Sequence, residues 1–478
     1  MADFNPSSVE IIKAELISYD KTIRRNLISS FIGRFEITQS MDRVAYSGWL
    51  YILDNAGILE GMPIRGEETL NLWLKGMDLG TEVKISAVIH KVTDIVPNSS
   101  SNGVTYKLHF ISKTSFKAST RKITQTHTNP VSVMAKDIFN SFFTNLGPGS
   151  FKHLKDDRRN LPFYSASYPL IAEKDEPERK FIIQPTENIA NILIPRLSPT
   201  EAMYFIASRG YNEDTPSQSF RFFETLENYY FCTDEYFIKS ILDKDVIKMF
   251  YAPVASYDAT SSNMQINRIE TIQVISKGID TSTDLYSGSY RNEVVEIDLI
   301  RRRLDITKFN FDDATYIDMS GTPRNNDSNP HTEQFRNDNF SDENAKRFMI
   351  FRNYTRAGDG PTTLNRDEHL SQIVQNRVSY YHHLNNTSLI VSTKGRLDIR
   401  PGMILDLDIK TLDGVSANIN TNLSLSGRYL VQTITHSRDN EGTLNTQMKI
   451  AKFDWSAPSR TTVAESLDIP YDPVVGGA

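Results

Sequence analysis

"FRFFETLENYYF", residues Phe220–Phe231, places six aromatic side chains in twelve consecutive positions. A polar break at 225–228 divides these aromatic residues into two short runs. Two strand-forming runs separated by a few turn residues are typical of a β-hairpin. The pattern therefore predicts a hairpin, 220–224 and 229–231, whose aromatic side chains pack against neighbouring helices as core. This interpretation argues against a cofactor site or a platform for stacking bases.

Two amphipathic helices are expected before the hairpin. Apolar residues recur at helical spacing over 131–142, and Asn129 and Pro130 suit the N-cap and the first turn. Ser198 is the expected N-cap of the second helix, because Glu201 is placed to complete a capping box. These helices and the hairpin together predict a small α+β unit.

A third, weaker helical pattern covers Thr186–Ile194, between the two stronger ones. It is expected to be a short helix of the same α+β unit.

Strand patterns occupy the region before this unit. Alternating apolar and polar residues, rich in β-branched and aromatic types, occur in four runs: Arg34–Gln39, Gly48–Asp54, Glu82–Ile95 and Val104–Ser112. The cluster at Asn98–Gly103 supplies a turn. An antiparallel barrel or sandwich of five or more strands is therefore expected near the N-terminus.

Strand patterns return after the α+β unit, over Ile266–Ile306 and again near the C-terminus. The later runs are Gly395–Lys410, Leu425–Arg438 and Leu444–Trp455. A turn at 401–402 and a hairpin turn at 439–442 predict a meander that closes a second barrel, with Tyr429, Val431 and Thr433 on one strand face.

A polar insertion interrupts the second β region. Ser320–Lys346 has almost no apolar residues, and it is expected to be a long loop or an arm that becomes ordered on contact. A helix rich in Gln, Asn and His is expected over Arg366–Leu384.

The predicted fold is mainly β with α+β parts: two β-barrel tube domains, a peripheral α+β domain and a polar insertion. The expected boundaries are 1–118 for the first β-barrel tube domain, 119–262 for the peripheral α+β domain, 263–306 and 385–458 for the two parts of the second tube domain, 307–384 for the inserted peripheral segment and 459–478 for the C-terminal tail.

Composition and charge exclude several classes of protein. The 478 residues exceed the about 250–300 at which single cores stop growing, so several domains are expected. A net charge of −6 argues against a chain that holds nucleic acid by neutralising many phosphates. The basic run Arg301–Arg303 is interpreted as a solvated strand end.

Cys232 is the single cysteine, which excludes an intrachain disulfide and a cysteine-based zinc site. A reducing cytoplasm is the expected site of synthesis. No signal peptide is expected, because the first twenty residues lack the basic segment, the apolar stretch and the small-residue cleavage site. No membrane anchor is expected, because no window approaches the about 20 apolar residues of a bilayer span.

No catalytic, cofactor-binding or metal-binding residue is assigned. Motifs of the GxSxG, HExxH, CxxC and phosphate-loop kinds are absent. Two carboxylate pairs, Glu67-Glu68 and Asp312-Asp313, could serve acid/base chemistry in a cleft, yet both lie beside turn-like sequence. His369 and the pair His382-His383 could be metal ligands, although polar residues on an exposed helix are the preferred interpretation.

The sequence resembles a known family in four stretches. These are "GMPIRGEETLNLWL" (Gly61–Leu74) with the strands that end in "LHFIS", the aromatic hairpin, the strands around "SGSYRNEVVEIDL", and the C-terminal "LDIRPGMILDLDI" with "LSGRYLVQTITHSRDNEGTLNTQMKIAK". Their order resembles the central baseplate hub proteins of contractile-tailed, T-even-like bacteriophages, which are related in fold to the hub part of type VI secretion spike proteins.

This resemblance implies a structural protein rather than an enzyme, without cofactors. It implies a homotrimer in which six barrels form a ring that continues the tail tube, with the α+β unit and the insertion outside. The implied partners are a tail tube or tube-initiator protein above, the central spike protein below, and baseplate wedge proteins. DNA would pass through the channel in the virion baseplate. The Asn-rich stretch at 324–339 departs from the family pattern.

Two other functions stay open at this point. A tail-associated peptidoglycan hydrolase would hide its acidic pair among the 59 carboxylates. A carbohydrate-binding tail module would expose clustered Trp and Tyr, but the chain has three Trp, and Trp49 and Trp73 lie in strand-like sequence.

Overall fold

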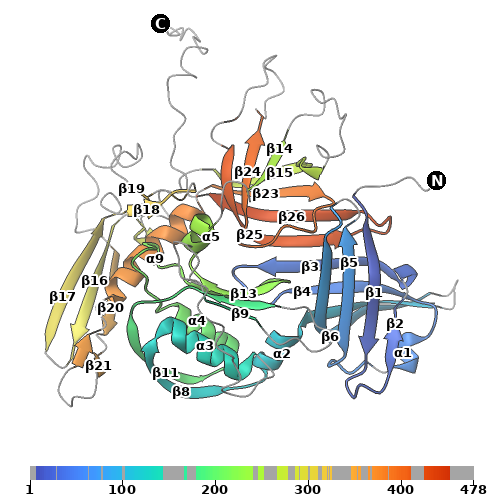
Figure 1. Ribbon diagram of the computed structural model, residues 1–478, viewed down its shortest axis with the longest axis horizontal. Coiled ribbons are helices and arrows are strands. Elements are labelled where there is room, and N and C mark those ends of the chain that lie inside the picture. The colour runs from blue at the N-terminus through green and yellow to red at the C-terminus, as the bar shows by residue number, and fades with distance from the viewer. Residues whose placement is uncertain are drawn as a thin grey trace, which may run out of the picture.

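The computed structural model of the chain is built mainly from β-strands, as the sequence predicts (Figure 1). Its largest sheet has 13 strands, contributed by both ends of the chain. The structure describes residues 7–27, 29–62, 64–76, 79–98, 103–143, 166–169, 179–240, 246–251, 266–277, 286–289, 291–299, 302–310, 315–319, 321, 323–325, 346–351, 354–356, 364–366, 369–385, 387–410, 422 and 425–452.

Seven strands form the first β unit and pair in the order β3-β4-β7-β6-β5-β1-β2. The four predicted strands are confirmed, and β1, β2 and β5 join them. The elements are β1 (Val9–Ile17), β2 (Arg24–Asn26), η1 (Ser29–Phe31), β3 (Ile32–Ser40), β4 (Ser47–Asp54), α1 (Ile58–Gly61), β5 (Thr69–Gly76), β6 (Glu82–Asn98), β7 (Gly103–Ser112) and α2 (Lys113–Ser119).

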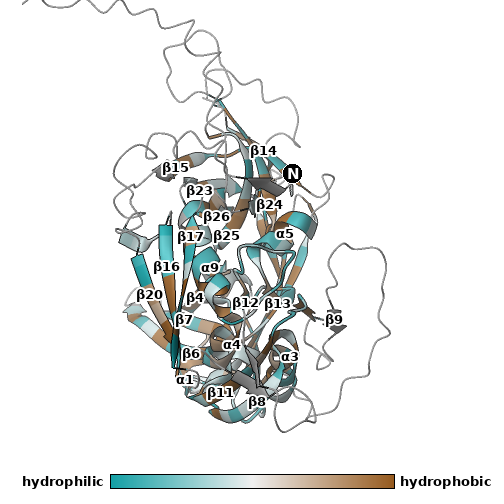
Figure 2. Cartoon of the chain, turned by 90° about the vertical axis from the view of Figure 1, so that its left-hand side faces the viewer, coloured by the Kyte–Doolittle hydropathy of each residue, from teal (hydrophilic) through white to brown (hydrophobic). Residues whose placement is uncertain are grey.

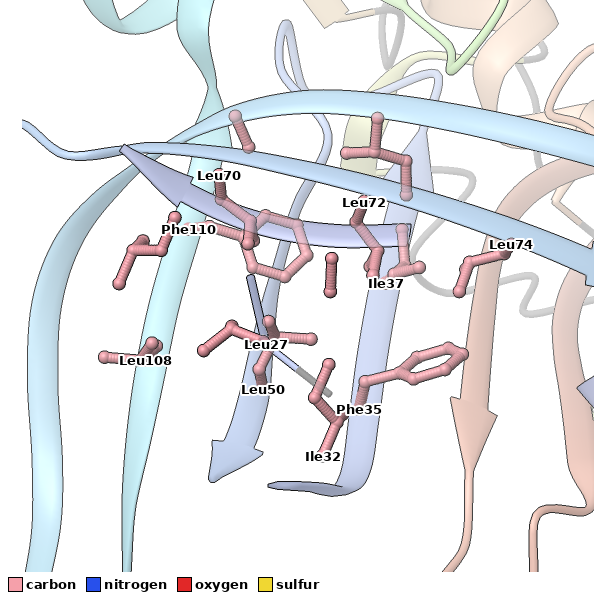
Figure 3. Close-up of a cluster of buried hydrophobic side chains, with 14 of the residues drawn as sticks. Leu27, Ile32, Phe35, Ile37, Leu50, Leu70, Leu72, Leu74, Leu108 and Phe110 are labelled. Atoms are coloured by element: carbon pink, nitrogen blue, oxygen red, sulfur yellow. The ribbon is translucent and has the colours of Figure 1, made fainter. Parts of the chain in front are cut away.

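The sheet of the first β unit curls around one core. Phe35 of β3 and Leu72 of β5 are fully buried in the same cluster, although three strands separate β3 from β5 in the sheet (Figure 3). At the open side, the Val9 N–H donates to Gly442 O (3.1 Å) and the Leu444 N–H donates to Ser7 O (2.8 Å). The turn between β25 and β26 therefore bridges the start of β1 to the neighbourhood of β3.

The second β unit contains β14 (Ile247–Tyr251), β15 (Thr271–Lys277), β23 (Thr387–Lys394), β24 (Ile404–Ile409), β25 (Gly427–Arg438) and β26 (Leu444–Lys452). Its strands pair in the order β14-β24-β25-β26-β23-β15. The Phe250 N–H donates to Asn267 O (3.0 Å), and the Ile269 N–H donates to Phe250 O (2.9 Å). Because β15 begins directly after these residues, the segment that leads into the last strand of this order lies beside β14, the first strand.

The predicted meander at the C-terminus is confirmed, with one change of register. Tyr429 and Val431 are fully buried in the core of the second β unit, but Thr433 is half-buried and meets Ser40 at 2.8 Å between hydroxyl oxygens. A β-bulge lies between Val431 and Thr433. An extra residue in a strand shifts the alternation by one, so Ile434 points inward instead.

The α+β unit contains β8 (Ile123–Pro130), α3 (Val131–Phe142), β9 (Ala166–Pro169), β10 (Lys180–Ile183), β11 (Ile189–Leu197), α4 (Pro199–Ala207), β12 (Arg221–Glu224), β13 (Asn228–Cys232) and α5 (Asp234–Ser240). The hairpin β12–β13 is confirmed, and its Phe222 packs against α3 and α4 residues in one core. The capping box of α4 is also confirmed, because the Ser198 N–H donates to Glu201 Oε2 at 2.7 Å and the Glu201 N–H donates to Ser198 Oγ at 3.3 Å.

Two local predictions are wrong. Thr186–Ile194 is not helical, because β11 pairs with β8 along this segment. Asn129 pairs with Ala190 as the penultimate residue of β8, so Pro130 takes the N-cap position of α3. In both cases strand pairing across the chain outweighs the local helical pattern, which is a weak preference.

A separate peripheral region contains β16 (Arg291–Asp298), β17 (Arg303–Asn310), β18 (Thr315–Ile317), β19 (Pro323–Asn325), β20 (Lys346–Phe351), β21 (Tyr354–Arg356), β22 (Leu364–Arg366) and α9 (Leu370–Leu384). The order β17-β16-β20 makes a three-stranded sheet, which lies at the left edge of the molecule beside α9 (Figure 1). The helix expected over 366–384 begins later, because 364–366 is a strand. Most of the insertion at 320–346 lies outside the described residues.

Strand pairing does not follow two of the expected boundaries. β14, assigned to the α+β domain by the boundary at 262, pairs in parallel with β24. β16, assigned to the second tube domain by the boundary at 306, pairs with β17 and β20 instead. Alternation identifies a strand but not its partner, which explains both differences. The other boundaries stay predictions.

Candidate functional site

A shared strand, β25, joins the two β units. Residues 427–430 pair with β24, and residues 433–438 pair with β3 along the same edge, while β26 takes the other edge. The change of partner coincides with the bulge after Val431. Bulges bend a strand and increase its twist. Continuous backbone hydrogen bonds therefore fix the two β units side by side.

The tip of the aromatic hairpin enters this junction. Leu226 is buried in the core of the first β unit, and its N–H donates to Gln39 Oε1 of β3 at 2.9 Å. Glu227 accepts a hydrogen bond from Arg400 Nη2 of the second β unit at 2.9 Å. Phe223 packs in a further cluster with Leu430 of β25. The hairpin thus contributes to three cores, whereas the sequence predicted packing within the α+β unit alone.

A buried network around an ion pair of the α+β unit links this unit to the first β unit. Arg179 pairs with Glu224 of β12, and the Arg179 side chain is 8% exposed while that of Glu224 is 0% exposed. Ser112 and Ser115 donate hydroxyl hydrogen bonds to the Glu224 carboxylate at 2.6 and 2.8 Å. Arg179 Nη2 also donates to Tyr46 Oη at 3.0 Å. Burial opposes the charge, but these neighbours raise the pKa of Arg179 above its ordinary value.

A second buried network joins the α+β unit to α9. Arg221 forms an ion pair with Asp234 at 2.9 Å, and its guanidinium lies 4.7 Å from the ring centre of Tyr381 on α9. Burial raises the pKa of Asp234, although Arg221 favours the charged form. Burial likewise raises the pKa of Glu235 to about 7, against the lowering effect of hydrogen bonds from Ser217.

The raised pKa of Glu235 results from burial, which nothing in the local sequence pattern indicates. Its side chain accepts hydrogen bonds at Oε2 from the Ser217 N–H (3.1 Å) and hydroxyl (2.8 Å). The residue is 0% exposed. A carboxyl group enclosed in this way cannot reach a substrate in this conformation, so its role here is structural.

The structure does not bring the candidate carboxylate pairs into a cleft. Glu68 is buried, and it accepts hydrogen bonds from the backbone N–H groups of Arg65 (2.7 Å) and Gly66 (2.9 Å), while Glu67 is exposed. Glu68 therefore stabilises the turn before β5. Asp312 and Asp313 lie outside the described residues.

The candidate histidines lie at opposite ends of α9. The ring of His369 stacks on Tyr211 with centroids 3.9 Å apart, whereas His383 is 1% exposed. Fourteen helical residues span about 21 Å, too far for one metal ion. The exposed-helix interpretation is wrong for His383, and the side chain of His382 is not described. Within the described residues, no group of three or more His, Cys, Asp and Glu could hold a metal.

The two described tryptophans carry lysines over their rings. The ammonium groups of Lys13 and Lys84 lie 5.3 and 4.5 Å from the ring centre of Trp73, and that of Lys107 lies 5.3 Å from Trp49. A carbohydrate-binding platform needs a free aromatic face for the sugar. These cation–π contacts stand against that use.

A cleft of about 510 Å³ lies between α9, β20 and the end of α4. Its lining is mostly apolar, with two arginines: Ser208, Arg209, Ile350, Phe351, Leu370, Ile373, Val374, Arg377 and Val378. The Arg377 guanidinium donates to the backbone oxygens of Gln218 and Ala207 (3.0 Å to the latter). This arginine therefore ties α9 to the α+β unit.

In the described part of the chain, no helix is long and apolar enough to cross a membrane.

Comparisons with known proteins give structural neighbours only. No family model and no curated protein matches the sequence. The chain is similar to a tail protein from Neisseria meningitidis MC58, with a TM-score of 0.48 and 9% identity over 93% of this chain and 96% of that one. It is also similar to the 43 kDa tail protein of prophage MuSo2 from Shewanella oneidensis, with a TM-score of 0.47 and 8% identity over 93% and 98%.

A third neighbour is an E. coli component of the type VI secretion system, itself described as structurally similar to the T4 bacteriophage tail proteins gp27 and gp5. Its TM-score is 0.37, with 8% identity over 93% of this chain and 77% of that one. Phage tail proteins and type VI secretion components are thus the solved structures that this chain is similar to.

Proposed function

We propose that this chain is a structural subunit of a phage baseplate hub. Three copies form a ring of six β units, two from each chain, which continues the tail tube and adapts its sixfold symmetry to a threefold central spike. DNA passes through the ring. The chain reaches the virion baseplate after synthesis in the host cytoplasm.

The observation that carries this proposal is the shared strand β25. Three chains can match a sixfold tube only if each presents two β units in a fixed relation. β25 supplies that relation through backbone hydrogen bonds to both units, and the hairpin tip adds contacts to both. The resemblance of the sequence to hub proteins supports the same assignment.

The proposed partners are those that the resemblance to hub proteins implies. The tail tube or a tube-initiator protein binds above the ring and the central spike protein binds below. The α+β unit and the peripheral sheet lie outside the ring, where baseplate wedge proteins bind. A net charge of −6 on each chain favours a channel wall without the strong, salt-dependent adhesion to DNA that a basic wall produces.

The proposed role of the chain is structural and does not include catalysis. Glu68, Glu224 and Glu235 are buried and hydrogen-bonded to the backbone or to serine hydroxyls, so their polar groups serve the fold. Among the residues that the structure describes, no observation favours the hydrolase or the carbohydrate-binding function.

Light scattering coupled to size-exclusion chromatography tests the assembly. The purified chain is measured over a range of concentrations, alone and with the spike protein. We expect a mass of three chains at the higher concentrations or on addition of the spike. A mass of one chain under every condition would contradict the proposed ring.

A further inference from the structure

The peripheral sheet β17-β16-β20 presents an apolar face on its outer side. In its ladder Val295 is opposite Ile306 and Met349, and Ile297 is opposite Leu304 and Phe351. Directly opposite residues share a face. These six side chains form a contiguous grid, here called the apolar face. Figure 2 looks at this side of the molecule and shows β17, β16 and β20 next to one another.

Three polar residues of β16 are on the inner side. Asn292, Glu296 and Asp298 are 1–2% exposed, although they alternate with the residues of the apolar face. Contacts between α9 and β16 place the helix on this inner side. A half-buried strand usually turns its apolar residues toward the core and its polar residues toward solvent. β16 shows the reverse arrangement, so packing in the described core does not explain the apolar face.

The exposed apolar area is large for a soluble chain. Four of the six side chains are more than 60% exposed, as is the adjoining Leu299: Leu299 70%, Leu304 64%, Ile306 61%, Met349 72% and Phe351 63%. Side chains of this size present about 150–200 Å² each when fully exposed, so the patch is on the order of 500–600 Å². That is the upper end for ordinary monomers, about 300–600 Å², and larger patches mark binding sites.

The border of the apolar face is basic. Lys308 and Arg347 both approach the carboxylate of Glu293, at 3.9 and 2.7 Å, and this row of two cations and one anion has a net charge of +1. Arg303, at the other end of β17, forms an ion pair with Asp305 of the same strand, so the net positive charge of the border comes from the row at Glu293. An occupant of this face therefore needs apolar side chains flanked by carboxylates.

The C-terminal segment of this chain has that composition. Within 459–478, Leu467, Ile469 and Tyr471 alternate with Asp468, Pro470 and Asp472, and Arg460 is the one basic residue. Alternation places the three apolar side chains on one side of an extended chain. Pro470 favours an extended conformation for the residue before it. By contrast, 326–345 offers Phe335 and Phe340 as its only large apolar residues.

The path from the last described residue to the peripheral sheet is short. Lys452 pairs with Thr387, which follows the end of α9 by three residues. Gln375 on α9 donates a hydrogen bond from Nε2 to Thr307 O of β17 at 2.8 Å. Nine helical residues cover about 14 Å, and the whole path from Lys452 to β17 stays below about 40 Å.

We propose that the segment 467–472 of the same chain docks on the apolar face, with Leu467, Ile469 and Tyr471 against the sheet. The fourteen residues that precede Leu467 after Lys452 span up to about 50 Å when extended, which exceeds the path. This docking covers the exposed apolar side chains and places Asp468 and Asp472 near the basic border. It is independent of the assembly into a ring.

Disulfide trapping in the full-length chain tests the docking. Ile306→Cys is combined with Ile469→Cys, and the variant is oxidised with copper phenanthroline. The native Cys232 is 0% exposed and does not compete. The matched control combines Ile469→Cys with Val133→Cys, a 40% exposed position on α3. We expect an intramolecular disulfide to form at least about tenfold faster in the first variant, because docking raises the effective concentration.

The outcomes separate the possible occupants. Equal rates in the two variants would overturn the docking, and a disulfide between two chains would show that another copy supplies the segment, which also contradicts the proposal. A second measurement uses the single variant Ile469→Asp, for which we expect increased binding of a hydrophobic dye, with Thr461→Asp, which lies before the docked residues, as control. Unchanged dye binding in both would overturn the docking. The mass of the assembly is measured separately, so a failed ring and a failed docking are distinguishable.

Discussion

Replacing Arg179 by methionine tests whether the buried network around Arg179 and Glu224 stabilises the contact of the α+β unit with the first β unit. Methionine keeps the length and apolar stem of the side chain but removes the charge and its donors. Glu224, at 0% side-chain exposure, then keeps only the hydroxyl groups of Ser112 and Ser115. Breaking a buried pair by removing one partner costs about 3–5 kcal/mol. Because two serine donors remain, we expect about 3 kcal/mol.

Urea denaturation followed by tryptophan fluorescence is the assay, because Trp49 and Trp73 both lie in the first β unit. With an m value of about 3 kcal/mol/M, a loss of about 3 kcal/mol lowers the midpoint by about 1 M. The control Lys122→Met breaks an ion pair whose side chains are 53% and 56% exposed, and it should cost less than about 1 kcal/mol.

A double variant, Arg179→Met with Glu224→Gln, removes the uncompensated charge as well. It should recover much of the loss, because the remaining amide oxygen still accepts from serine. If Arg179→Met were no more destabilising than Lys122→Met, the buried network would not stabilise the contact between the two units and the reasoning would be refuted.

Three further predictions concern pH, packing and activity. The pKa of Glu235 is raised to about 7 from an unfolded value of 4.5, so the folded state binds its proton more tightly: stability is complete below about pH 4.5 and falls as pH rises to 7. Glu235→Gln should remove this dependence, which urea titrations measure as the difference in the free energy of unfolding between pH 5 and pH 8. An unchanged difference in the variant would contradict the burial argument. Tyr429→Asp should unfold the second β unit, because an unpaired charge replaces a fully buried ring, whereas Tyr429→Phe loses only the hydrogen bond to Leu425 O and should cost about 1 kcal/mol; a Tyr429→Asp variant that melts like the wild type would refute the register. The purified chain should not clear a peptidoglycan gel, and clearing that is abolished by substitution of one carboxylate would reveal a hydrolase.

Local chemistry explains which elements the sequence could predict. The capping box at Ser198 and the polar break at 225–228 act over a few residues, so their patterns are readable without the fold. The segment 186–194 has a helical pattern but contributes to strand β11, because its pairing with β8 involves residues about sixty positions away. Local propensity is weaker than such tertiary pairing.

The junction could be predicted only in part. The aromatic residues of the hairpin indicate a core, but the contact of Leu226 with the first β unit and that of Glu227 with Arg400 depend on how distant segments meet. The sequence does not predict that β25 changes its partner strand either, because nothing in its alternation marks the bulge after Val431. Burial of Glu235 also needs the fold, because a carboxyl group beside Asp234 at the start of a helix usually faces solvent.

Electron microscopy of the purified chain, in class averages of negatively stained particles viewed down the symmetry axis, tests the proposed ring most directly. The proposal predicts a closed ring around a central hole, with six similar lobes related by threefold symmetry and smaller densities outside them for the α+β and peripheral regions. Compact particles without a hole, or closed rings that do not contain three copies of the two joined β units, would contradict it.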